Sequence, residues 1–150
     1  MASSNANAPT PVQSTLRFAH LAAGGAHTCG VTGNGAAWCW GATFRGQLGA
    51  GDTVAGALPR LVGGGHLFRT GETGNYYSCG LAQSGAAWCW GDNLTAELGN
   101  GELSALPAIL PVAVTGARHF TALTLGREHA CAVTAEGEAW CWGSSIYGKL

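Results

Sequence analysis

The sequence predicts an all-β fold of repeated units, either propeller blades or solenoid turns, and three observations support this prediction. The string AAWCWG occurs at residues 36–41 and again at 86–91, and EAWCWG follows at 138–143. The chain of 150 residues contains 25 glycines, which is typical of a chain with many tight turns. Charged residues make up only 10% of the sequence, well below the roughly 25% of average globular proteins. A motif that recurs about every 50 residues indicates propeller blades or solenoid turns.

The chain divides into a tail and three repeats. Residues 1–15 are small and polar and lack the basic and apolar regions of a secretory signal, so we expect a disordered tail or a linker. The repeats cover approximately residues 16–65, 66–116 and 117–150. The third repeat stops inside its own motif, which predicts that the chain is a fragment of a longer propeller.

Each repeat contains a hairpin with the same expected register. In the first repeat the strands HTCGV and AAWCWG flank a turn that ends in Gly35. A three-residue hairpin loop needs a left-handed residue at its last position, which glycine adopts without steric cost. This loop places Cys29 opposite Cys39 and Gly30 opposite Trp38. Because the side chains of a strand alternate, the cysteines lie on one face and the tryptophans on the other. Both faces are apolar, so we expect each sheet to pack between two neighbours.

The repeated motif resembles that of a known family. In the first repeat Gly-x-x-His-Thr-Cys precedes the hairpin turn, Trp-Cys-Trp-Gly follows it, and Gly-Gln-Leu-Gly-x-Gly completes the motif. This pattern is similar to the regulator-of-chromosome-condensation repeat, and more closely to its cysteine-bearing bacterial branch, over residues 18–150. The resemblance implies a β-propeller of about seven four-stranded blades. The pattern is broken at Tyr77, which replaces the histidine of the other repeats, and at Ala96, which replaces a glycine.

Three repeats are too few to close a propeller ring, because propellers usually have about four to eight blades. We expect either that further blades lie in a longer protein or that copies of the chain form a homo-oligomer that closes the ring. An isolated copy would expose the faces of its terminal blades, and exposed apolar faces and strand edges favour association.

The six cysteines form three pairs, one in each hairpin. Opposed residues on neighbouring strands have Cα atoms about 4.5–5.5 Å apart, within the range that a disulfide accepts. We therefore expect the disulfides Cys29–Cys39, Cys79–Cys89 and Cys131–Cys141. The alternative is three pairs of buried free thiols. Disulfides would indicate an extracellular or periplasmic protein, and the lack of a signal peptide in this sequence would again favour truncation.

The sequence offers little that indicates catalysis or metal binding. His27 with Cys29, and His129 with Cys131, could suggest zinc, but zinc sites usually pair cysteines roughly two to four residues apart. Both histidines are expected to be hydrogen-bonded core residues. The sequence has no Gly-x-Ser-x-Gly nucleophile motif and no phosphate-binding loop with its lysine. We therefore expect no metal, no cofactor and no enzymatic activity.

Partner recognition is expected where the repeats differ, because the shared residues build the blades. After each Trp-Gly pair the chain reads ATFR, DNLT and SSIY. Aromatic residues and arginine are enriched among residues that dominate interfaces. The candidate partner contacts are Phe44, Arg45, Asp92, Asn93, Ile146 and Tyr147. The alternative is that these are solvated loop residues without a partner.

The sequence thus favours a non-catalytic scaffold that binds another protein. The resemblance implies this role for much of the family, including a propeller-type inhibitor of β-lactamases and receptor ectodomains. It also implies an alternative, guanine-nucleotide exchange on a small GTPase, which is the activity of the founding member. A formal net charge of −1 gives no electrostatic reason to expect nucleic acid as a partner. No apolar run reaches the roughly 18 residues of a membrane helix, so membrane insertion is not expected either.

Overall fold

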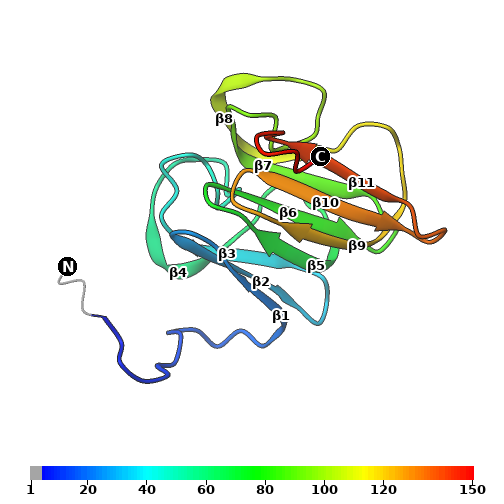
Figure 1. The fold of residues 1–150 in the computed structure, drawn as a ribbon. Helices are drawn as coiled ribbons and strands as arrows, with labels where there is room; N and C mark the ends of the chain where they lie inside the picture. Colours follow the sequence, from blue (N-terminus) through cyan, green and yellow to red (C-terminus); the bar gives the residue numbers. More distant parts are fainter. Residues whose placement is uncertain (1–4) are drawn as a thin grey trace.

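The structure is a computed structural model that describes residues 5–150, and the first four residues of the predicted tail lie outside the described residues. Residues 5–17 contain no regular secondary structure and lead to the first sheet (Figure 1). The remainder forms eleven β-strands in three separate antiparallel sheets. No helix among residues 5–150 is long and apolar enough to cross a membrane.

Each repeat of the sequence forms one sheet, whose strands follow each other in chain order. The first blade contains β1 (Phe18–Ala23), β2 (His27–Thr32), β3 (Ala37–Gly41) and β4 (Gly56–Leu61). The second blade contains β5 (Phe68–Thr73), β6 (Tyr77–Ala82), β7 (Ala87–Asn93) and β8 (Ser104–Ala113). The third blade contains β9 (Phe120–Leu125), β10 (His129–Thr134) and β11 (Ala139–Gly143). The third blade thus has three strands within the described residues, where the first two have four.

The hairpin register agrees with the register expected from the sequence. Gly35 has a φ of 88°, and its N–H donates to the carbonyl of Thr32 at 2.9 Å. The N–H of Thr32 in turn donates to the carbonyl of Ala36 at 3.0 Å, which closes a three-residue loop. Cys29 therefore faces Cys39, and the equivalent cysteines face each other in the other two blades.

All six cysteines are paired in disulfides, and each disulfide lies within one hairpin. The pairs are Cys29–Cys39, Cys79–Cys89 and Cys131–Cys141. Each disulfide links β2 to β3, β6 to β7, or β10 to β11, so that the second and third strands of every blade are covalently joined. The alternative of buried free thiols does not hold in this structure.

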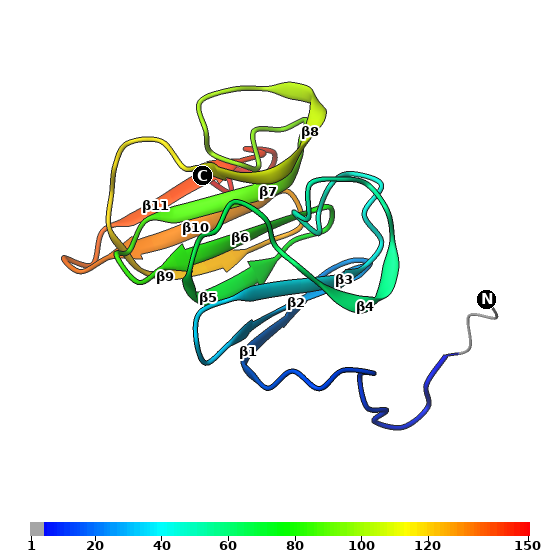
Figure 2. The same cartoon turned by 180° about the vertical axis from the view of Figure 1, so that it is seen from behind.

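The three sheets stack face to face in chain order (Figures 1 and 2). The cysteine-bearing face of each blade packs on the tryptophan-bearing face of the next blade. In the first core, Cys39 and Val31 lie against Phe68 and Trp90 of the second blade. In the second core, Cys89 and its neighbours lie against the third blade, including Phe120, Ala130 and Ala132. The hydrophobic core is therefore located between blades.

The predicted core role of the tryptophans depends on the blade. Trp90 is fully buried, with 1% of its surface exposed. Trp40 is at the same position in the first blade and is only partly buried, because no blade covers that face within the described residues. Trp140 is 37% exposed and lies under the guanidinium of Arg118, which is 3.3 Å from the ring centroid.

Candidate protein-binding surface

The loops that follow the tryptophan clusters lie at the same end of the blades as the turns between the first two strands. One backbone hydrogen bond of 2.8–3.0 Å joins the loop to the turn in each blade. The three bonds run from Ala42 N to Ala26 O, from Asp92 N to Tyr76 O and from Ser144 N to Glu128 O. We call this end of the molecule the loop face; it comprises turns 24–26, 74–76 and 126–128 and loops 42–47, 92–97 and 144–149.

A hollow of about 400 Å³ lies on the loop face and is lined by residues of all three blades. Phe44 and Arg45 line it from the first blade, Asp92 and Leu94 from the second, and Arg127 from the third. Phe44 is 59% exposed and Leu94 is 47% exposed, so the hollow presents apolar side chains to solvent. Basic and acidic groups lie beside them, which gives the hollow a mixed charge.

The apolar part of the hollow is held in place by contacts between neighbouring blades. The ring of Phe44 packs edge-on against the ring of Tyr76, with 5.1 Å between the ring centroids and an angle of 62° between the rings. This geometry is one of the favoured arrangements of aromatic pairs. Phe44 follows β3 and Tyr76 precedes β6, so the pair joins the first blade to the second.

The structure brings some of the predicted contact residues together and separates others. Phe44, Arg45 and Asp92 line the same hollow, although Asp92 is largely buried. Ile146 and Tyr147 lie in the equivalent loop of the third blade and do not line this hollow; they are 57% and 97% exposed. These two residues present a separate exposed apolar site on the loop face.

Asn93 does not lie on the exposed surface, in contrast to the expectation for a contact residue. It is 2% exposed, and its amide oxygen accepts the N–H of Leu98 at 3.1 Å. Its amide nitrogen donates to Asn100 and to the carbonyl of Glu102. Thr43 closes its own loop in the same way, by accepting the N–H of Leu48 at 3.3 Å. The side chain of Asn93 therefore stabilises the loop from inside.

Eight of the eleven residues that line the hollow were not among the predicted contacts. Four of the eight belong to turns between the first two strands of a blade, namely Asn75, Tyr76, Arg127 and Glu128. In these turns Ala26, Tyr76 and Glu128 occupy equivalent positions. These turns also differ in sequence between the repeats, as the loops after the Trp-Gly pairs do. The same criterion, applied to the turns, would have identified these residues as candidate contacts.

The buried histidine of the first blade has a structural role. Ser78 of the second blade donates its hydroxyl proton to the carbonyl of Gln47 at 3.0 Å, so it accepts a hydrogen bond from Nε2 of His27 at 2.8 Å. Burial lowers the pKa of His27 from 6.5 to about 4. His27 is therefore neutral at pH 7 and is the hydrogen-bonded core residue that the sequence predicts.

The residues at the same position in the other blades behave differently. The hydroxyl of Tyr77 lies within hydrogen-bond distance of the carbonyl oxygens of Gly126 and His129, both in the third blade. Burial, together with the nearby charge of Glu97, raises the pKa of Tyr77, so the phenol stays protonated. The imidazole of His129 makes no hydrogen bond within residues 5–150, in contrast to the prediction. His129 has no next blade to contact within these residues.

No group of three or more His, Cys, Asp or Glu side chains within residues 5–150 is arranged to hold a metal ion. The cysteines of both His-x-Cys pairs are in disulfides, so neither supplies the thiolate that zinc requires. The loop face, with its exposed aromatic, aliphatic and charged side chains, is suited to contact with another macromolecule.

Antiparallel sheets of three or four strands that stack face to face, each formed by one repeat, define a protein of the β-propeller class. Residues 18–47 and 113–149 match the sequence model of the Regulator of chromosome condensation (RCC1) repeat. These two segments, in the first and third repeats, are therefore RCC1-type repeats. No curated protein matches the sequence.

Solved structures with the same fold share little sequence with this chain. Human WBSCR16 is 19% identical, with a TM-score of 0.78 over 87% of this chain and 34% of that protein. Yeast RCC1 (Prp20), solved with Kap60 bound to it, is 24% identical, with a TM-score of 0.73 over 85% of this chain and 32% of that one. The ectodomain of the Physcomitrella patens receptor kinase CR4 is 26% identical, with a TM-score of 0.58 over 88% and 29%. The chain thus spans about a third of the length of these structures.

Proposed function

We propose that the protein is a non-catalytic scaffold that binds another protein through the hollow on its loop face. The observation that carries this proposal is the convergence of Phe44, Arg45 and Leu94 on one hollow lined by three blades. Aromatic residues and arginine commonly dominate the binding energy of protein interfaces. The partner expected from this lining has an apolar side chain for the Phe44 ring and charged groups at its rim.

The blades support binding because they hold the loops in fixed positions. Each loop begins directly after a strand that a disulfide joins to its neighbour. A surface that is already ordered before binding loses less conformational entropy when the complex forms. The same pairs favour a protein that works outside the reducing cytosol, in an extracellular or periplasmic location, because disulfides persist mainly in oxidising compartments.

Guanine-nucleotide exchange, the alternative that the family suggests, has weaker support. Yeast Prp20 shares the fold with this chain, and a study of its structure describes its binding to Gsp1p and histones. At 22–24% identity this likeness extends to the fold alone. The loop face carries no feature that favours a GTPase over another protein.

Crosslinking in the native extracellular or periplasmic fluid tests the scaffold proposal. The chain is compared with a Phe44→Ala/Leu94→Ala variant and with the control Tyr147→Ala, which removes the most exposed aromatic residue outside the hollow. We expect the control to be crosslinked to the same partner as the unmodified chain. The double variant should give at least about tenfold less of this crosslinked partner, because hot-spot truncations typically cost 2 kcal/mol or more. Equal recovery by both variants would contradict the proposal.

A parallel measurement separates the two candidate functions. The chain is mixed with small GTPases loaded with labelled GDP, and the release rate is followed. The scaffold proposal predicts no acceleration. Faster release that depends on Phe44 or Leu94 would favour exchange instead.

A further inference from the structure

We propose that the partner inserts a basic side chain into the hollow of the loop face, with its charged end at the carboxylates of Asp92 and Glu97. This inference rests on the proposed function, because it names the chemistry of the group that the same hollow binds. It concerns residues of the second blade, where the loop after the tryptophan cluster differs in charge from its two equivalents.

The two carboxylates are buried without a cation beside them. Asp92 is 6% exposed and Glu97 is 4% exposed, and both line the hollow. Neither forms an ion pair within residues 5–150. A buried charge lowers stability unless an opposite charge and hydrogen bonds compensate it. The two residues therefore hold negative charge where a cation from outside would stabilise it.

Each carboxylate uses one oxygen atom within its own loop and leaves the other free. The N–H of Asn93 donates to Oδ1 of Asp92 at 3.1 Å, and the N–H of Thr95 donates to Oε2 of Glu97 at 2.8 Å. Oδ2 of Asp92 and Oε1 of Glu97 accept no hydrogen bond within residues 5–150. The hydroxyl of Thr95 also lines the hollow and has no partner among these residues. A guanidinium or ammonium group carries several donors and no acceptor, which suits these free oxygen atoms.

The fold of the loop requires neither charge. In the first blade Ala42 stands at the position of Asp92, and Gln47 stands at the position of Glu97. Oε1 of Gln47 accepts the N–H of Arg45 at 2.9 Å, which is the same loop contact that Glu97 makes with Thr95. The backbone N–H groups of Ala42 and Asp92 join the loop to the turn in the same way. Uncharged residues thus suffice for the loop, and a cationic ligand accounts for the two carboxylates.

The remaining charges leave the hollow with a negative balance. Three carboxylates, of Asp92, Glu97 and Glu128, and two guanidinium groups, of Arg45 and Arg127, line it, so its formal net charge is −1. Nε of Arg127 pairs with Oε1 of Glu128 at 3.5 Å. These two charges compensate each other, which leaves the single charge of Arg45 against the two buried carboxylates.

The apolar wall of the hollow suits the stem of a long basic side chain. Phe44 and Tyr76 form the aromatic pair of this wall, and Leu94 lines the same hollow. Lysine and arginine pack their aliphatic stems along apolar surface and place the charged end among polar groups. A cation close to an aromatic ring is also attracted by the face of the ring. Arginine fits best, because its planar fork can donate to two carboxylates at once.

Nuclear magnetic resonance of the isotopically labelled complete chain tests the proposal with a small probe. The probe is Nα-acetyl-argininamide, and the matched control is Nα-acetyl-citrullinamide, in which a neutral urea group replaces the guanidinium. The N–H signals of Asn93 and Thr95 report on the site, because each N–H donates to one of the two carboxylates. We expect the arginine probe to shift both signals saturably and the citrulline control to bind at least about tenfold more weakly.

A third signal controls for unspecific effects of the probe. Gly35 lies in the hairpin turn at the other end of the first blade, so its N–H signal should not move. Equal binding of the two probes, or no saturable shift with the arginine probe, would overturn the proposal.

Two variants that change the charge of the hollow in opposite directions test the sign of the effect. Asp92→Asn/Glu97→Gln keeps the shape of both side chains and their acceptors for the loop N–H groups, but removes both charges. It should weaken binding of the arginine probe, and reduce the crosslinked partner, at least about tenfold. Arg45→Gln removes a cation and should strengthen binding of the probe. The opposite order of the two variants would indicate a site for an acidic group and would overturn the proposal.

Urea unfolding separates a ligand-binding role of the carboxylates from a structural one. Without a partner, Asp92→Asn/Glu97→Gln should be at least as stable as the unmodified chain, because it removes two buried charges. A clearly less stable double variant would assign the carboxylates to the loop itself and would also overturn the proposal.

The crosslinking results distinguish this inference from the proposed function. A partner that is lost by Phe44→Ala/Leu94→Ala but retained by Asp92→Asn/Glu97→Gln would overturn the inference and leave the proposed function in place. A partner that is retained by Phe44→Ala/Leu94→Ala would contradict the proposed function. The titration with the two probes would in that case still decide whether the hollow binds a guanidinium group.

Discussion

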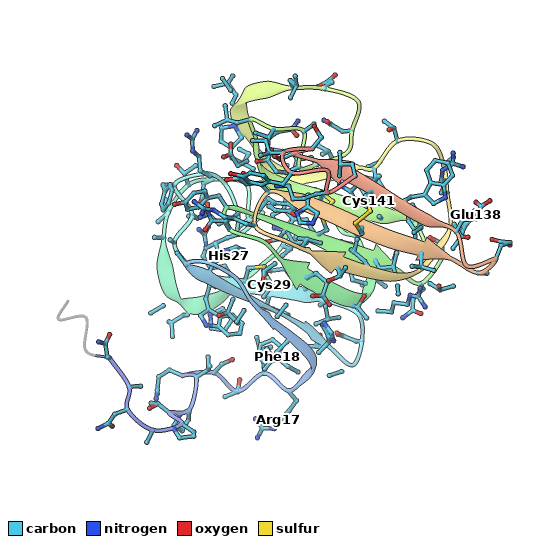
Figure 3. The ribbon with its side chains drawn as sticks, viewed as in Figure 1. Arg17, Phe18, His27, Cys29, Glu138 and Cys141 are labelled. Atoms are coloured by element: carbon cyan, nitrogen blue, oxygen red, sulfur yellow. A yellow bond between two sulfur atoms is a disulfide. The ribbon has the colours of Figure 1, made fainter. Side chains whose placement is uncertain are left out.

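The middle blade and the third blade contain the same Trp-Cys-Trp-Gly string but bury it to different extents. Cys89 and Trp90 of the middle blade are 0% and 1% exposed. In the third blade Cys141 is exposed, and Trp142, which occupies the position of Trp90, is only partly buried. Figure 3 shows Cys141 on the last strand, at the open side of the stack of sheets. The burial of a repeated motif is therefore determined by the neighbouring blade and not by the motif itself.

This difference follows from the location of the core. Both hydrophobic clusters lie between blades, and each combines the cysteine-bearing face of one blade with the tryptophan-bearing face of the next. Stability in repeat proteins is approximately a sum of terms for single repeats and for interfaces between neighbours. Substitutions on covered faces should thus cost much more than the same substitutions on open faces. The comparisons below are made at concentrations at which the chain is monomeric.

The largest difference is expected for the second tryptophan of the motif. Trp90→Ala should lower the free energy of unfolding by about 3–5 kcal/mol, because it leaves a cavity in a packed interface. Trp40→Ala removes the same side chain from the open face of the first blade and should cost less than about 2 kcal/mol. Urea unfolding measures both values. Equal costs would show that the neighbouring blade does not determine the contribution of the indole.

The buried histidine should make the first interface sensitive to acid. The pKa of His27 is about 4 in the folded chain and 6.5 in the unfolded chain, so the unfolded chain binds the proton first as the pH falls. The contribution of His27 to the free energy of unfolding is therefore fully present above pH 6.5. It decreases by about 3 kcal/mol in total as the pH falls from 6.5 to 4. Urea unfolding across this range measures the loss.

Two variants identify the origin of this pH dependence. His27→Tyr introduces the residue that the second blade has at this position and should remove most of the loss between pH 6.5 and 4. His129→Tyr changes the same position on the open face and should leave the loss in place. A His27→Tyr variant with the wild-type pH profile would be inconsistent with this assignment.

The smallest difference is expected for two glycines with left-handed backbone. Gly49 has a φ of 64°, and a Cβ there would lie 2.7 Å from the ring of Trp90 in the next blade. Gly148 has a φ of 69° with no heavy atom within 4 Å of a Cβ, and Ala96 occupies its position in the second blade. Gly148→Ala should cost about 1 kcal/mol, from backbone strain alone. Gly49→Ala should cost about 2 kcal/mol more, because it also overpacks the interface.

Features within one repeat could be predicted from the sequence, because short-range chemistry determines them. The position of Gly35 at the end of a three-residue turn defines the register of the hairpin, and the register brings Cys29 opposite Cys39. Features that depend on a neighbouring blade could not be predicted in this way. The hollow between Phe44 and Arg127 exists because residues far apart in the sequence meet where blades stack.

The error at Asn93 has a related cause. Variation between copies identified its position as a candidate contact, but all three copies have a short polar residue there, as at Thr43. A side chain that hydrogen-bonds its own loop requires such a residue, and Thr43 and Asn93 both do so. The type of residue, and not its variation, was the informative signal at this position.

The most direct test of the comparison between covered and open faces is partial reduction of the native, monomeric chain by a water-soluble phosphine, followed by alkylation and peptide mapping. We predict that Cys131–Cys141 is reduced first, because it lies on the open face of the third blade. Cys29–Cys39 and Cys79–Cys89 should resist, because the next blade covers each of them. Equal rates for the three disulfides, or earlier reduction of Cys79–Cys89, would contradict the stacking order on which the account depends.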